Sequence, residues 1–167
     1  MLVDSIKVNV NKQDAMKKIF TKTPLISKVI QFNNKAKDVH LEYIEFKILT
    51  YEIISKKGNM SFFRNNFKTF NITMIVNTYS GYSESVDNAP TTVKRYIPKS
   101  CIKKSKVDEY QIIEEVKNQI FKFLGKKYKN NLLENMNIQN IKLVEVKSIY
   151  KPYWVANYNG KNIFVDA

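Results

Sequence analysis

The chain has 167 residues, of which 44% are hydrophobic and 26% are charged. These fractions are typical of globular proteins, so they exclude a disordered chain and a bundle of membrane helices and leave room for one domain or two very small ones. Lys and Arg number 28 against 15 Asp and Glu, a formal net charge of +13. No apolar run approaches the roughly 20 residues that span a bilayer.

The N-terminal segment predicts no secretion signal. Residues 1–11 alternate polar and apolar side chains and lack the apolar stretch of a signal peptide. We therefore expect a cytoplasmic protein if Met1 is the true start, and a cell-envelope protein if a leader has been removed. Asn11-Lys12-Gln13-Asp14 then resembles a capping box and predicts a helix that Pro24 interrupts.

A hairpin is expected after this helix. Residues 43–51 form an aromatic and β-branched run that is typical of a strand, and residues 70–76 form the returning strand. Between them lies an inserted basic segment, around residues 56–68. It contains Phe62-Phe63-Arg64, two adjacent Phe without an obvious core partner, so we expect an exposed contact for a partner or a membrane surface.

The middle of the chain holds most of the excess charge. Residues 56–107 contain ten basic and two acidic residues. Two prolines and few apolar anchors predict that residues 87–104 form an exposed basic connector. Only Arg64 and Arg95 are arginines, so the other 26 basic residues are lysines, which fits codon bias as well as polyanion binding and argues against sequence-specific DNA recognition.

The second half repeats the order of elements. Ser105-Lys106-Val107-Asp108 predicts another helix start, and six apolar residues at steps of three and four follow it: Ile112, Val116, Ile120, Phe123, Leu124 and Tyr128. Strands are expected at residues 141–146 and 150–158. Asn159-Gly160 predicts a two-residue turn, and residues 162–165 the returning strand.

An internal alignment supports a duplication. Residues 43–51 align without gaps on residues 150–158, with tyrosine at both ends and an aromatic residue at the same interior place. The predicted fold class is therefore α+β, with two similar units that each pack a helix on an antiparallel sheet. The expected boundaries are residues 1–86 and 105–167, joined by the connector at 87–104.

These features resemble the PepSY-type module of bacterial envelope proteins. The resemblance rests on Asn11-Lys12-Gln13-Asp14-Ala15, on Tyr153-Trp154-Val155 before Asn159-Gly160, and on the closing Val165-Asp166-Ala167. Residues 76–81 form a looser first copy of that closing motif. The resemblance covers most of the chain as two tandem copies and implies a bacterial accessory module that inhibits or binds a protein.

Catalytic chemistry has little support in the sequence. His40 is the sole histidine and Cys101 the sole cysteine, which excludes an internal disulfide and a usual structural zinc site. A hydrolase would require His40 to converge with Cys101 or with a carboxylate. The pairs Asp108-Glu109 and Glu114-Glu115 fit helix starts, and the four glycines form no phosphate-binding loop. We therefore expect no enzyme, no cofactor and no metal.

The predicted function is non-catalytic binding of a protein or peptide, reached by strand addition at an open sheet edge. The alternative is lysine-driven binding of nucleic acid or another anionic surface. The candidate interaction residues are basic or lie in the inserted segment: Lys56, Lys57, Phe62, Phe63, Arg64, Lys94, Arg95, Lys103 and Lys104.

Overall fold

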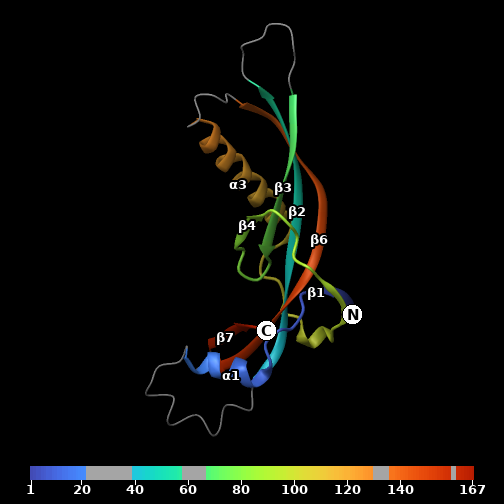
Figure 1. Ribbon diagram of the computed structural model, residues 1–167, viewed down its shortest axis with the longest axis vertical. Coiled ribbons are helices and arrows are strands. Elements are labelled where there is room, and N and C mark those ends of the chain that lie inside the picture. The colour runs from blue at the N-terminus through green and yellow to red at the C-terminus, as the bar shows by residue number, and fades with distance from the viewer. Residues whose placement is uncertain (22–38, 58–66, 130–135, 159–160) are drawn as a thin grey trace. The chain divides into compact units, whose positions relative to one another are not determined.

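The computed structural model describes residues 1–21, 39–57, 67–129, 136–158 and 161–167 (Figure 1). Of the residues that the structure describes, 53% lie in strands and 24% in helices. Within the described residues no helix has the length and apolar character needed to cross a membrane.

Seven strands and two α-helices make up the described part of the chain. In chain order they are β1 (Leu2–Ser5), α1 (Lys12–Thr21), β2 (His40–Lys57), β3 (Phe67–Asn77), β4 (Ser83–Val86), β5 (Val93–Tyr96), α3 (Glu109–Lys129), β6 (Met136–Tyr158) and β7 (Lys161–Asp166). A short 3-10 turn, Lys99–Cys101, follows β5.

The strands form one mixed sheet, so the predicted pair of separate helix-on-sheet units is wrong. The strand order is β4-β3-β2-β6-β1-β5, and β7 pairs with β6. The sheet is mixed because β1 runs parallel to β6 at Ser5 and Tyr150, whereas the β2–β3 and β6–β7 pairs are antiparallel. Those two hairpin pairings confirm the predicted strand pairs.

The physical reason for the error is the length of two strands. β6 is a single strand of 23 residues that contains both predicted strands, 141–146 and 150–158, and β2 extends over 18 residues. Two compact units share these strands: unit 1 comprises residues 1–45, 91–104 and 149–167, and unit 2 comprises residues 46–90 and 105–148.

Each helix also packs on a hairpin from the other half of the chain. In unit 1, Ile19 of α1 lies in a cluster with Ala156 of β6 and Val165 of β7. The indole of Trp154 donates a hydrogen bond to the carbonyl of Val10, 2.8 Å away, just before α1. The sequence had suggested that a helix packs on the hairpin that follows it.

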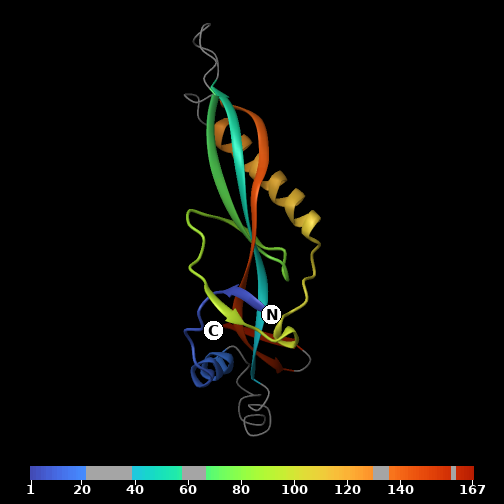
Figure 2. The ribbon, with the colours of Figure 1, turned by 90° about the vertical axis from the view of Figure 1, so that its right-hand side faces the viewer.

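Unit 2 has the larger core. Ten buried residues form it: Leu49, Tyr51, Ile53, Met74, Val76, Ile112, Val116, Ile120, Leu124 and Ile141. Because strand side chains alternate, the odd residues of β2 and the even residues of β3 meet one face of α3. Figure 1 shows α3 beside β3 and β2, and the turned view of Figure 2 shows it next to β6 of the same sheet. Four of the six residues in the predicted α3 stripe are buried there, whereas Phe123 is 60% exposed.

The predicted basic connector is part of the fold of unit 1. β5 pairs antiparallel with β1, from Leu2 and Tyr96 to Ser5 and Val93. Ile97 is fully buried in a cluster with Val3 and Tyr43. This segment was expected to be exposed because it is basic and has few apolar anchors. Val93, Lys94 and Tyr96 are exposed, but strand pairing with β1 and the buried Ile97 hold the segment in the fold.

The helix starts differ in detail from the predicted caps. Asn11 Oδ1 accepts a hydrogen bond from the Asp14 amide at 2.9 Å, which confirms the first cap. At the second start Asp108 takes this role, since its Oδ2 accepts from the Tyr110 amide at 2.9 Å. The hydroxyl of Ser105 instead donates to the carbonyls of Thr78 and Val107. α3 therefore begins at Glu109, four residues after Ser105.

Candidate functional site

Three of the predicted basic residues have partners within unit 1. Lys94 Nζ lies 3.1 Å from the carboxylate of Asp4, and Lys103 Nζ lies 3.1 Å from that of Glu42. Arg95 donates a hydrogen bond to the hydroxyl of Tyr43, 3.1 Å away. These cations therefore stabilise the fold of unit 1 and are not a free basic patch.

The remaining candidates divide between the two units and the residues outside the described part. Lys104 is an exposed residue of unit 1. Lys56 and Lys57 end β2 in unit 2, and their side chains lie outside the described part, as do Phe62, Phe63 and Arg64 entirely.

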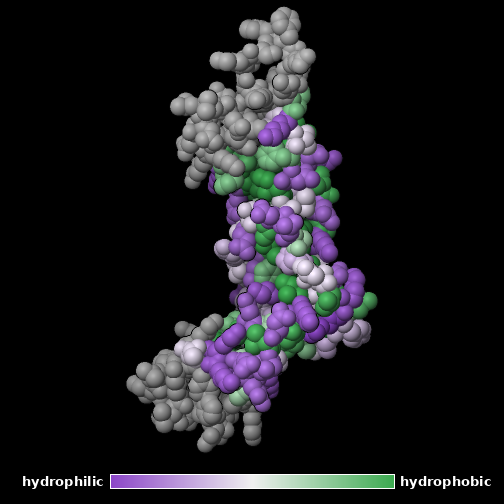
Figure 3. Space-filling view, in the orientation of Figure 1, coloured by the Kyte–Doolittle hydropathy of each residue, from purple (hydrophilic) through white to green (hydrophobic). Residues whose placement is uncertain are grey.

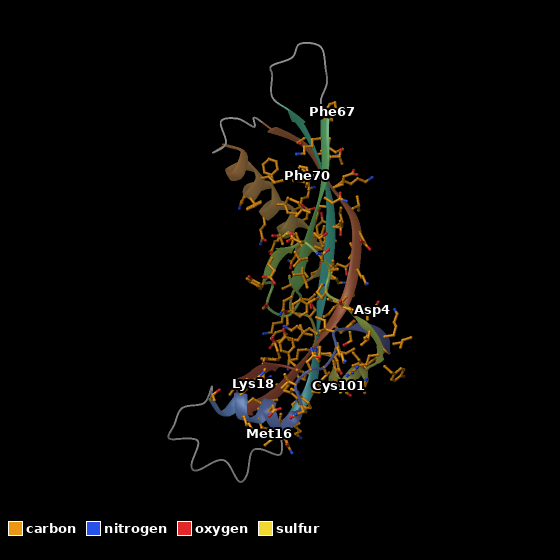
Figure 4. The ribbon with its side chains drawn as sticks, in the orientation of Figure 1. Asp4, Met16, Lys18, Phe67, Phe70 and Cys101 are labelled. Carbon is orange, nitrogen blue, oxygen red and sulfur yellow. The ribbon has the colours of Figure 1, made fainter. Side chains whose placement is uncertain are left out.

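His40 and Cys101 have different surroundings in unit 1. His40 Nε2 lies 3.2 Å from a carboxylate oxygen of Glu42, the same carboxylate that pairs with Lys103. Cys101 is half-buried and packs against the cluster of Val3, Tyr43 and Ile97 (Figure 4). In the part of the chain that the structure describes, no group of three His, Cys, Asp or Glu side chains is arranged to hold a metal ion.

The candidate site is a groove in unit 2, with a volume of about 660 Å³. Its walls are residues 70–74 of β3, residues 83–87 at β4, and Gln119, Ile120, Phe123 and Leu124 of α3. We call this site the α3–β3 groove. Hydrophobic side chains reach the surface on this face of unit 2, between hydrophilic ones (Figure 3).

Hydrogen bonds and one ion pair hold α3 against the strands that form the groove. The hydroxyl of Tyr51 donates to the Ile113 carbonyl at 2.9 Å, and burial raises the pKa of Tyr51 to about 12, with a smaller contribution from the Glu114 carboxylate. Lys47 Nζ lies 2.6 Å from the carboxylate of Glu109 at the start of α3. The groove wall is therefore preorganised.

The second wall is fixed by β4 and the turn before it. The hydroxyl of Ser83 donates to Gln119 Oε1 at 2.6 Å, which joins β4 to α3. Asn77 Oδ1 accepts from the amides of Tyr79 and Ser80, and Gly81 has a φ of 76°, a conformation that favours glycine. This tight turn sets the position of β4 on β3.

β4 covers only part of the edge of β3. β3 pairs with β2 from Phe67 to Asn77, but with β4 only from Thr73 to Val76. Residues 67–72 have no partner strand on that side within the described residues. Phe67 is 56% exposed at the start of this stretch, and Phe70 lies further along it (Figure 4).

The backbone groups of β3 that point toward this open edge can be identified. The amide of Asn77 donates to the carbonyl of Tyr82 on the β4 side, at 2.9 Å. Because backbone groups alternate along a strand, the amides and carbonyls of Asn71 and Thr69 face the same side. An edge with such groups is a template for another strand.

The side chains of the groove are apolar at the floor and mixed at the rim. Phe70 and Ile72 of β3 meet Ile120 and Leu124 of α3, and the exposed Phe123 stands beside them. The described residues of the lining include Glu84 and Asp87 but no Lys, Arg or His. This composition suits a largely apolar ligand whose polar groups are backbone amides.

The sequence did not identify this groove as a site. Phe123 was assigned to the buried stripe because it has helical spacing, and residues 70–76 were identified only as a strand. Periodicity offered no signal for Phe123, because at 100° per residue it falls in the same arc as Ile112, Val116 and Ile120, and only Phe121 lies on the opposite side of the helix.

Comparisons with known proteins give no relative for this chain: no family model, no curated protein and no solved structure matches it. The resemblance to PepSY-type modules thus stays a prediction.

Proposed function

We propose that this chain is a non-catalytic binding protein that captures an extended peptide segment in the α3–β3 groove. The peptide adds as a strand to the open edge of β3, beyond the end of β4. The observation that carries the proposal is the edge of residues 67–72 opposite β2, which has no partner strand within the described residues and lies beside a partly apolar groove.

The geometry supports strand addition in two ways. Main-chain hydrogen bonds to Asn71 and Thr69 supply affinity, and alternate side chains supply specificity. A residue that continues the register of β4 lies opposite Ile72 or Phe70, and its side chain points to the face that α3 covers. Such a side chain enters the groove between Phe70 and Phe123.

The length of the open edge sets the size of the ligand. Six residues at a rise of about 3.3 Å span about 20 Å, so a peptide of five or six residues fills the edge. Within this length about three side chains point toward α3, and a groove of about 660 Å³ has room for them.

The alternative, binding of nucleic acid or another anionic surface, has weaker support. It relies on the net charge of +13, but Lys94, Lys103 and Arg95 already contact partners within unit 1. The part of the α3–β3 groove lining that the structure describes contains no basic residue.

The test is selection of a phage-displayed library of random decapeptides on the immobilised full chain. The consensus peptide is then synthesised with a fluorescein label, and its affinity is measured by fluorescence anisotropy. Asn71→Pro removes an outward amide without touching the β2 ladder, so we expect about tenfold weaker binding, in line with a lost backbone hydrogen bond and its steric block. Asn71→Thr keeps the amide and is the matched control.

Peptides methylated on single backbone nitrogens give an independent readout. Strand addition predicts an alternating pattern, in which methylation at every second position abolishes binding and methylation between them has little effect. A uniform response along the peptide, or equal affinity of the Asn71→Pro and Asn71→Thr chains, would overturn the proposal.

A further inference from the structure

The α3–β3 groove differs in charge from the chain around it. Basic residues outnumber acidic ones by 28 to 15 in the whole sequence. In unit 2 they still outnumber them, by 13 to 9. Yet among the described residues that line the groove the charged ones are two acids, Glu84 and Asp87.

Both carboxylates lie at the β4 end of the open edge. Asp87 directly follows Val86, the last residue of β4, and lines the groove there. Glu84 pairs with Ile75, so its side chain lies on the sheet face away from α3 and accepts a hydrogen bond from the hydroxyl of Tyr82 at 3.3 Å. The two acids therefore flank the β4 end on both faces of the sheet.

These carboxylates are available to a ligand. Both residues are exposed, and among the described residues no cation forms an ion pair with either of them. By contrast, Asp4 and Glu42 in unit 1 each contact a lysine. An added strand whose first residue follows Val86 comes into direct reach of Asp87.

We infer that the segment bound by the α3–β3 groove carries a cationic residue, Lys or Arg, at the end next to β4 and an apolar or aromatic residue in the groove. This inference rests on the proposed strand addition and names the chemistry of its partner. The apolar residue contacts Phe70 and Phe123, and the cation pairs with Asp87. Charge complementarity of this kind sets the register and the choice of partner.

Two opposing effects bear on a cationic ligand. The net charge of the whole chain repels it, but charges further away than about 8 Å are screened at physiological ionic strength. The carboxylate of Asp87 acts at contact distance, where screening is small. The contact between Asp87 and the cation of the ligand therefore outweighs the net charge of the chain, and the groove prefers a cationic ligand.

The test uses octapeptides with a common core of alternating Thr and Val or Phe. Each peptide carries two Lys, two Gln or two Glu at its N-terminal or C-terminal end, and its affinity for the full chain is measured by fluorescence anisotropy. We expect the Lys peptides to bind about tenfold more tightly than the Glu peptides, with the Gln peptides between them.

Two charge reversals give a matched comparison. Asp87→Lys should reverse the order, so that the Glu peptides bind best. Glu145→Lys changes the net charge by the same amount at an exposed position of β6 outside the groove lining, and it should leave the order unchanged.

The outcomes separate this inference from the proposed function. Equal binding of Lys and Glu peptides, or an equal shift in both reversed variants, overturns the inference while strand addition stands. If no octapeptide binds and the methylation pattern does not alternate, the proposed function falls as well, and this inference falls with it.

Discussion

Unit 1 and unit 2 use their charged side chains in opposite ways. Unit 1 has 15 basic and 6 acidic residues, a net charge of +9, whereas unit 2 has 13 and 9, a net charge of +4. In unit 1 three of the predicted cations contact Asp4, Tyr43 or Glu42. The candidate site instead lies in unit 2, where the lining of the groove is acidic and apolar.

This comparison teaches that the density of one charge does not by itself mark a binding surface. What distinguishes a site is that its polar groups lack partners in the fold. In the described part of unit 2 these are the backbone groups of Thr69 and Asn71 and the carboxylate of Asp87. The cores differ as well, since unit 2 has one cluster of ten buried residues and unit 1 has clusters of four and three.

The largest expected effect on stability comes from a substitution in the core of unit 2. Leu124→Ala removes a buried side chain from the ten-residue cluster and from the groove floor, and should lower the free energy of unfolding by about 3 kcal/mol or more. Ile19→Ala, in the four-residue cluster of unit 1, should cost about 2 kcal/mol. Urea unfolding measures both, and a smaller loss for Leu124→Ala than for Ile19→Ala would contradict the contrast between the cores.

An intermediate effect tests how α3 is fastened to β2. Tyr51→Phe leaves the Ile113 carbonyl without its donor and should cost about 1–2 kcal/mol near neutral pH. The pKa of Tyr51 is raised from 10.0 to about 12, so its contribution is complete below pH 10 and is lost as the pH rises from 10 to 12. The stability gap between the wild type and Tyr51→Phe should therefore shrink over this window.

The comparison of the wild type with Tyr51→Phe at the same pH cancels the effect of the alkaline titration of lysines on stability, because the two chains share every other titratable group. A gap in unfolding free energy that stays constant from pH 8 to pH 12 would contradict the raised pKa, because it requires the same Tyr51 pKa in the folded and unfolded chains.

The smallest effects concern the ion pairs of unit 1. A double-mutant cycle with Lys103→Met and Glu42→Gln should give a coupling energy of about 1 kcal/mol, because both side chains are mostly buried. The same cycle on Lys94 and Asp4 should give about 0.3 kcal/mol, since the Lys94 side chain is 68% exposed. Equal coupling energies for the two ion pairs would contradict the view that the burial of an ion pair, and not its charge alone, decides how much it stabilises the fold.

Much of the local structure could be predicted from the sequence. Runs of β-branched and aromatic residues predicted the β2–β3 and β6–β7 pairs, the cap at Asn11 predicted the start of α1, and the apolar stripe predicted α3. These features depend on neighbouring residues, so a single sequence contains them.

The arrangement of these elements could not be predicted in the same way. Nothing local distinguishes a helix that packs on the next hairpin from one that packs on a hairpin more than 100 residues away, as α1 does with Ala156 and Val165. β5 was likewise not predicted from residues 93–97, because this strand is defined by its pairing with β1. The candidate site depends on where β4 ends on β3, which is a property of the turn at Gly81 and not of a motif.

The division of the chain between the units has a consequence for the order in which they form. Unit 2 has all of its residues once Ser148 has been added, whereas unit 1 also requires residues 149–167. During synthesis, therefore, the N-terminal 45 residues must wait for the C-terminal strand and hairpin before their own core can close. Unit 2 can bury its ten-residue cluster first, and the last residues of the chain then act as the closing segment of the part that was made first.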